Sequence, residues 1–266
     1  MKPSSNYRLE ARNMLQNRWT ESAVATLLIF FCVGLFSGPY LGFTLNKTSQ
    51  LGTSISTLVF VLGVFLLVAP LQYAYNIAFL RRARYSENTL LKDIMAVFGV
   101  SYSRAVKSTL LITAYILLIA TAAMIVAVVI TIPISMLVTP DGVSFAEYIS
   151  NDEGSTVFAA IMLVIMYLIM LPCTMVFAYA IQPYMFVVEE HPEWGIATCV
   201  KETIKIMKGH KAKLFVLDLS FIGWGILATM TGGIGMLWLQ PYMAASHAAF
   251  YEDLTKGNTY ISEDLQ

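Results

Sequence analysis

The most informative feature of the sequence is a series of long apolar runs separated by polar segments. A membrane-spanning helix needs about 20 largely apolar residues in succession. Four runs reach this length at once: Ala23–Leu45, Ile55–Leu80, Thr109–Val138 and Val157–Val188. The last two are longer than a flat bilayer needs, so we expect them to tilt, to kink at a proline or to project beyond the membrane.

A fifth apolar region, Leu214–Tyr251, is too long for a single span. As one straight helix it would reach about 57 Å at about 1.5 Å per residue. Thr231-Gly232-Gly233 lies near its middle and is typical of a turn. We therefore divide the region into Leu214–Met230 and Ile234–Tyr251, which predicts six spans in three hairpins. The alternative is five spans followed by an interfacial helix.

Three polar stretches precede the outgoing spans and carry apolar residues at helical spacing. They are Asn6–Trp19, Thr89–Phe98 and Trp194–Met207, and each also contains Lys or Arg. We predict that they form amphipathic helices on the cytoplasmic membrane surface.

Proline, glutamine and tyrosine recur together in each returning span. The second span contains Pro70-Leu71-Gln72-Tyr73, the fourth contains Gln182-Pro183-Tyr184, and the sixth contains Gln240-Pro241-Tyr242. This order suggests three repeats, 1–85, 86–190 and 191–256, each with an interfacial helix, an outgoing span and a returning span. The alternative is coincidence, because these residue types also serve helix packing in membranes.

The composition excludes a soluble domain. Apolar residues make up 57% of the chain and charged residues only 13%, and the mean hydropathy is +0.66. A soluble domain carries about 25% charged residues. We therefore predict an all-α, polytopic helical integral membrane protein that forms a single domain over residues 1–266, with 257–266 as a short cytoplasmic tail. The net charge of zero gives no bulk field for nucleic acid, which we do not expect as a partner.

The distribution of basic residues predicts the orientation. With the N-terminus in the cytoplasm, sixteen of the seventeen Lys and Arg residues fall on the cytoplasmic side, and only Lys47 does not. This positive-inside pattern predicts that both termini are cytoplasmic. Five spans would move only Lys256 outside, so the charge distribution leaves the alternative open.

Catalytic and metal-binding patterns are weak. The three cysteines and three histidines form no metal-ligand spacing, and we expect no metal and no cofactor. Glu189-Glu190-His191 resembles the paired glutamates of membrane endopeptidases, but the arginine that follows them in those enzymes is absent. We therefore name no catalytic residue, and a membrane-embedded enzyme is the least favoured function.

Asp218 is the one acidic residue predicted to lie within the membrane, and such a residue suggests a function. It belongs with Gln72, Gln182 and Gln240 to the half of the spans nearer the cytoplasm, at depths of about 7 to 18 Å. We predict that these four residues form a polar tier around a pocket open to the cytoplasmic leaflet. The alternative is that each glutamine serves its own proline break and Asp218 faces the headgroups.

The two ends of the chain carry specific motifs. The first includes Arg8, Ala11-Arg12 and Trp19, and the second includes Leu214–Trp224, Gly233-Ile234-Gly235, Trp238 and Pro241-Tyr242. On these residues the chain resembles a family of bacterial polytopic membrane proteins catalogued as domain of unknown function 975. The resemblance implies a bacterial cytoplasmic-membrane location and a fold, and it implies no mechanism.

The function predicted from all these features is a non-catalytic one. We expect a lipid-interacting or scaffold membrane protein whose basic helices contact the anionic lipids of the inner leaflet. A protein partner or a homo-oligomer is compatible with this role. The alternative is a transporter or permease-like protein for a lipid or a small polar solute.

Overall fold

The computed structural model describes residues 2–46, 50–84, 89–138, 147, 150 and 152–263. Within these residues the chain is helical and contains no strand, which confirms the predicted all-α class. The elements are α1 (Ser4–Leu15), α2 (Trp19–Asn46), α3 (Gln50–Gly63), the π-helical segment η1 (Val64–Val68), α4 (Ala69–Arg84), α5 (Leu90–Val138), α7 (Asp152–Ile181), α8 (Tyr184–Glu190), α9 (Ile196–Ile206), α10 (Lys211–Leu219), α11 (Ile222–Met230) and α12 (Met236–Glu263).

The chain folds as two compact units. One unit combines Met1–Leu111 with Ala180–Gln266, and the other is Ile112–Tyr179. The smaller unit contains the distal parts of α5 and α7, where the rings of Tyr115 and Phe177 lie with centroids 6.1 Å apart. The larger unit contains every other described helix and all of the candidate sites below.

The described residues contain five helices that are long and apolar enough to cross a membrane, so the protein is a polytopic membrane protein. They are Trp19–Gly42, Gln50–Arg84, Phe98–Ile134, Gly154–Glu190 and Lys211–Met230. This is one fewer than the six spans predicted, because α12, which contains the sixth predicted span, is not among these five helices. That helix carries His247, Glu252 and Asp253 among its apolar residues.

Helix α12 forms the core of the larger unit. Its buried face consists of alanines followed by aromatic residues: Ala244, Ala245, Ala248, Ala249, Phe250 and Tyr251. Alanines at this spacing allow neighbouring helices to approach closely, and α12 packs against α1, α2 and α4. The final apolar region therefore forms the centre of a helix cluster, and its alanine face is not exposed to lipid.

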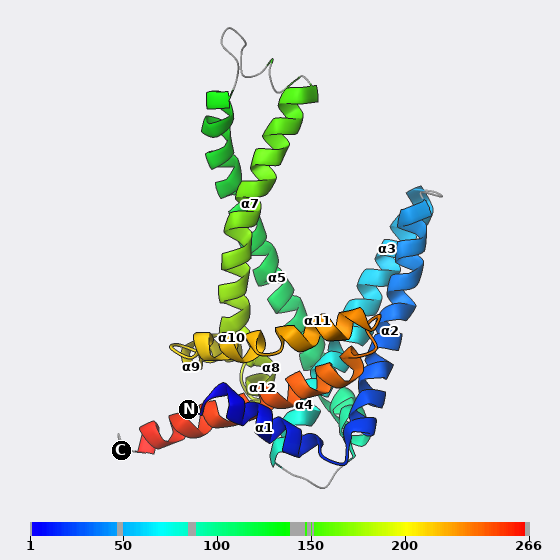
Figure 1. Cartoon of the computed structure of the whole chain (residues 1–266), viewed down its shortest axis with the longest axis vertical. Coiled ribbons are helices and arrows are strands. Elements are labelled where there is room, and N and C mark those ends of the chain that lie inside the picture. The colour runs from blue at the N-terminus through cyan, green and yellow to red at the C-terminus, as the bar shows by residue number, and fades with distance from the viewer. Residues whose placement is uncertain are drawn as a thin grey trace. The chain divides into compact units, whose positions relative to one another are not determined.

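The two ends of the chain meet within this unit. Helix α1 lies beside α12 (Figure 1), and the Tyr7 hydroxyl donates a hydrogen bond of 2.6 Å to Asp253 Oδ2. This contact predicts that both ends lie on the same side of the membrane, with an even number of crossings. The crossing of Lys211–Met230 would require a return through α12. In Figure 1, however, α10, α11 and α12 run across the direction of α2 and α3, which favours a hairpin along the membrane surface.

The predicted turn at Thr231–Gly235 is confirmed. Gly232 and Gly233 have φ values of +67° and +88°, which side chains rarely adopt. Thr231 Oγ1 donates to the Ala228 carbonyl and accepts from the Gly235 amide, at 2.7 and 2.9 Å. The predicted span Leu214–Met230, in contrast, is divided at Ser220 and Phe221 into α10 and α11.

Two of the three predicted amphipathic helices are separate elements. Helix α1 buries Tyr7, Ala11 and Leu15, and α9 buries Val200 while Met207 follows it, also buried. The third stretch, Thr89–Phe98, is helical from Leu90 but forms the first part of α5, which continues without a break. The predicted repeats stay a prediction, as does the division into one domain and a tail.

We predict that Gly235→Ala destabilises the hairpin of α11 and α12. A Cβ at this position would lie 2.7 Å from the Ala228 Cα, so the two helices must separate. Overpacking of this kind costs about 1–3 kcal/mol. Thermal unfolding of the purified protein should show the loss, and Gly223→Ala, where a Cβ meets nothing within 4 Å, should not. Equal melting temperatures for both variants would contradict the close packing.

The meeting of the two chain ends predicts equal accessibility at Ser5 and Lys256, which are both exposed. Cysteines introduced there, in a chain with its three native cysteines replaced, should react identically with a membrane-impermeant reagent from either side of the membrane. Labelling of one position from outside intact cells and of the other only after lysis would contradict the even number of crossings.

Candidate functional site

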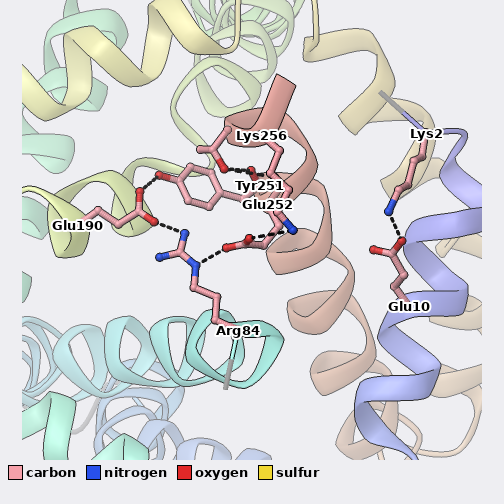
Figure 2. A network of polar contacts seen from close by, with 8 residues as sticks. Lys2, Glu10, Arg84, Glu190, Tyr251, Glu252 and Lys256 are labelled. Atoms are coloured by element: carbon pink, nitrogen blue, oxygen red, sulfur yellow. Dashed lines mark hydrogen bonds and ion pairs between the residues drawn. The ribbon is translucent and has the colours of Figure 1, made fainter. Parts of the chain in front are cut away.

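A network of charged residues joins the helix ends of the larger unit. The Arg84 guanidinium at the end of α4 pairs with Glu190 at the end of α8 and with Glu252 of α12. Figure 2 shows Arg84 between these two carboxylates. The Tyr251 hydroxyl donates to Glu190, and Lys256 Nζ lies 3.7 Å from Glu252. One arginine therefore ties three helices together.

The two other arginines of this helix end make similar connections. Arg81 pairs at 2.9 Å with Glu189, which also accepts hydrogen bonds from Tyr73 and from Ser101 of α5. Arg82, whose side chain is only 3% exposed, pairs at 3.0 Å with Glu21 of α2. Breaking a buried pair by removing one partner typically costs about 3–5 kcal/mol. Glu189 and Glu190 thus have structural partners, which gives no support to the endopeptidase resemblance.

The N-terminal helix is attached through Asp253. This carboxylate accepts hydrogen bonds from the Tyr7 hydroxyl and from the Lys2 amide, at 2.6 and 2.9 Å. Burial alone would raise the pKa of Asp253, but these two donors outweigh burial and hold the pKa below its usual value of 3.8. Burial and the bond to Asp253 raise the pKa of Tyr7 well above 10. Figure 2 also shows Lys2 turned toward Glu10 on α1.

Two members of the predicted polar tier are linked through a histidine. His247 Nε2 lies 2.7 Å from Asp218 Oδ1, and His247 Nδ1 lies 2.8 Å from Gln182 Nε2. If the glutamine amide donates to Nδ1, then Nε2 carries the proton and donates it to the carboxylate. Gln182 Oε1 is buried and has no hydrogen-bond partner in the described part of the chain.

The other two glutamines are not part of this chain of hydrogen bonds. Gln72 is half-buried on α4, and its carbonyl accepts a hydrogen bond from Asn76 Nδ2 at 2.8 Å. Gln240 is half-buried on α12. The Leu66 carbonyl, in the π-helical segment before Pro70, accepts a hydrogen bond from the Tyr102 hydroxyl at 2.7 Å. A pocket formed by all four tier residues stays a prediction.

An apolar groove of about 370 Å³ lies between the first and last helices of the larger unit. Its walls come from α1, α2, α11 and α12 and the turn between the last two: Arg12, Trp19, Trp224, Leu227, Ala228, Thr231, Gly235, Trp238, Leu239 and Tyr242. The rings of Trp19 and Tyr242 lie with centroids 6.2 Å apart, and Phe221 packs edge-on against Tyr242 at 5.1 Å. Arg12 is the one charged residue in this lining.

The described residues offer little support for a metal site or a reactive cysteine. No group of three or more His, Cys, Asp or Glu residues among those that the structure describes could hold a metal ion. Cys199 is buried, and burial raises the pKa of its thiol, which disfavours a reactive thiolate. The groove and the charged network are therefore two features of this unit that need a functional explanation.

A family model described as "Protein of unknown function (DUF975)" matches residues 1–258. The chain belongs to this family. No curated protein and no solved structure matches the chain. Membership of the DUF975 family thus agrees with the resemblance found in the two ends of the sequence, and those two ends meet in space at the groove, through Arg12, Trp19, Trp224 and Trp238.

The groove itself was missed by sequence analysis. Three of the four tryptophans in the chain line it, yet Trp19 is more than 200 residues away from the other two. The available signal was the clustering of tryptophan at two distant ends of the DUF975 chain. Pattern reasoning assigned those residues to separate repeats and therefore did not bring them together.

We predict that Tyr7→Phe weakens the pH dependence of stability in acid and removes the contribution of Tyr7 in alkali. The lowered pKa of Asp253 stabilises the fold above about pH 4, and this stabilisation is lost as the pH falls further. The raised pKa of Tyr7 makes stability fall as the pH rises above 10. The variant should lose about 1.5–3 kcal/mol at neutral pH and should show a flatter profile at both ends.

Thermal unfolding between pH 3 and 11 measures this effect. Tyr167→Phe is the matched control, because Tyr167 is 68% exposed. If Tyr7→Phe and the control have the same pH profile as the unaltered protein, the contact between α1 and α12 does not contribute to stability.

Proposed function

We propose that the protein is a non-catalytic, lipid-interacting protein of the bacterial cytoplasmic membrane. In this proposal the groove holds an acyl chain of an anionic lipid, and Arg12 binds the headgroup. The observation that carries the proposal is the combination of an apolar, tryptophan-lined groove with a single cation in its lining.

The groove suits an acyl chain in size and chemistry. Its volume of about 370 Å³ falls within the range of small-molecule sites. Trp224 and Leu227 are 58% and 56% exposed, so the wall formed by α11 also has surface available to membrane lipid. A lipid tail can therefore reach the groove from the bilayer without crossing water, and tryptophan is typical of the membrane interface.

Arg12 suits an anionic headgroup. The residue is exposed in the last turn of α1, and within the described residues it has no carboxylate at ion-pair distance. Anionic lipids concentrate on the cytoplasmic leaflet. The positive-inside distribution of Lys and Arg supports a cytoplasmic position for α1 and for both termini.

One observation favours a transport role as the second candidate. The linked side chains of Asp218, His247 and Gln182 come from three segments, and within the described residues one buried amide oxygen has no partner. Ionisable residues in this setting are typical of polar pathways. A permease-like function would require Asp218, whereas acyl-chain binding in the groove would not.

Quenching of tryptophan fluorescence by brominated lipids tests the proposal. In a Trp194→Phe background, all three remaining tryptophans line the groove. The protein, in neutral vesicles, should be quenched by a small fraction of brominated phosphatidylglycerol more strongly than by brominated phosphatidylcholine. Arg12→Gln should reduce this preference about ten-fold, because a hydrogen bond to a charged group contributes about 1.5–3 kcal/mol.

Two controls separate the groove from general membrane effects. Lys208→Gln removes an exposed cation that does not line the groove and should keep the preference. Asp218→Asn should also keep it. Equal quenching by the two lipids, or an unchanged preference in Arg12→Gln, would overturn the proposal. A lipid preference lost only in Asp218→Asn would favour the transport role.

A further inference from the structure

A second cavity of the larger unit has a cationic lining. It measures about 460 Å³ and lies between the first part of α5 and the segment that leads into α9. Helix α5 contributes Ser103, Arg104, Lys107 and Leu111, and the other wall is formed by Val188, Pro192, Trp194, Gly195, Ile196 and Ala197. None of these residues lines the tryptophan groove.

The two cations of this cavity are not neutralised by the protein. Arg104 is half-buried and Lys107 is exposed, one turn apart on α5. Within the described residues neither has a carboxylate at ion-pair distance. Of the carboxylates on the adjoining segment, Glu189 binds Arg81, and Glu193 is 61% exposed with its Oε1 at 3.2 Å from His191 Nδ1. An arginine and a lysine that face one cavity without an acid create a site for an anion.

The opposite wall contains the start of α9, where backbone N–H groups add partial positive charge. Helix α9 begins here after Gly195, which has no side chain to cap the first amides of the helix. The first amides of a helix have no carbonyl partner within it, and the helix dipole adds partial positive charge at this end. Ile196 and Ala197 both line the cavity, so the amides at the start of α9 border it together with the two cationic side chains.

The rest of the lining is apolar. Leu111, Val188 and Trp194 border the cationic groups, and Trp194 stacks on His191 with ring centroids 3.8 Å apart. Stacking holds the loop before α9 in place. Such a lining suits an anion that carries an organic group, and a bare halide would not use it.

We propose that this cavity binds a phosphate group, carried either by a lipid headgroup or by a soluble phosphate ester. Arg104 and Lys107 bind two of its oxygens, and the first amides of α9 bind a third. The site is separate from the groove and would add phosphate recognition to a protein that otherwise contacts lipid tails.

Native mass spectrometry and calorimetric titration of the full chain in a maltoside detergent test the proposal. The two probes are glycerol 3-phosphate, which is soluble, and dihexanoyl phosphatidic acid, which carries the same group on a lipid. We expect at least one probe to bind with an affinity that falls with rising salt. Binding of both probes assigns the site to the phosphate itself, and binding of phosphatidic acid alone assigns it to a lipid headgroup.

Four variants locate the binding site. Arg104→Gln and Lys107→Gln should each weaken binding at least ten-fold. Ile196→Pro removes one amide donor at a helix position that accepts proline, so it should weaken binding several-fold without loss of helix. Lys201→Gln, an exposed cation farther along α9, should bind as the unaltered protein does.

Each variant must be folded before its binding is compared. The variants are compared only if they elute as the unaltered protein does in size-exclusion chromatography, and Arg104→Lys retains the charge if Arg104→Gln fails to fold. The proposal is overturned if neither probe binds, or if Arg104 and Lys107 variants bind both probes unchanged. Either result would leave the acyl-chain groove unaffected, because that groove is tested through Arg12.

Discussion

The pairing of three arginines at the end of α4 with glutamates on other helices is the interaction on which the larger unit depends. Arg81 reaches Glu189, Arg82 reaches Glu21, and Arg84 reaches both Glu190 and Glu252. Isolated surface pairs contribute little, but these pairs connect the start of α2, the end of α8 and the middle of α12 at one place. Apolar packing alone cannot specify which helix ends meet in a membrane, because lipid is as apolar as leucine. The charged pairs supply that specificity.

The position of α12 follows from this constraint. Glu252 ties the helix to Arg84, and Asp253 ties it to α1 through Tyr7. Between these contacts and the turn at Gly232 and Gly233, the alanines of α12 pack against α1, α2 and α4. The close approach of Gly235 to Ala228 then places α11 beside the start of α12. The rings of Trp19, Trp224 and Trp238 line the groove between these helices.

Much of this fold could be predicted from local sequence. Hydropathy identified the long helices, and the glycine pair identified the turn before α12, because both depend on neighbours along the chain. The character of α12 could not be predicted in the same way: its alanines satisfy a hydropathy window whether they face lipid or other helices. The link from Asp218 to Gln182 through His247 was also beyond pattern reasoning, because its members lie 36 to 65 positions from Gln182 and depend on tertiary packing. The sequence predicts how far along a helix a residue lies, but it does not predict which neighbouring helix the side chain faces.

Two sets of cations in the larger unit differ in how their charge is used. Arg81, Arg82 and Arg84 are neutralised by glutamates, so their charge is used within the fold. Arg12, Arg104 and Lys107 line cavities and have no carboxylate at ion-pair distance within the described residues. A positive charge next to apolar walls is partly desolvated, and it is stabilised when an anion completes its hydrogen bonds. Because the apolar walls favour a ligand with a hydrocarbon part and the cations favour a negative one, the two proposals describe related ligands, anionic molecules with an organic part. The membrane itself supplies such molecules at high local concentration, so even modest affinity at each cavity would keep it occupied.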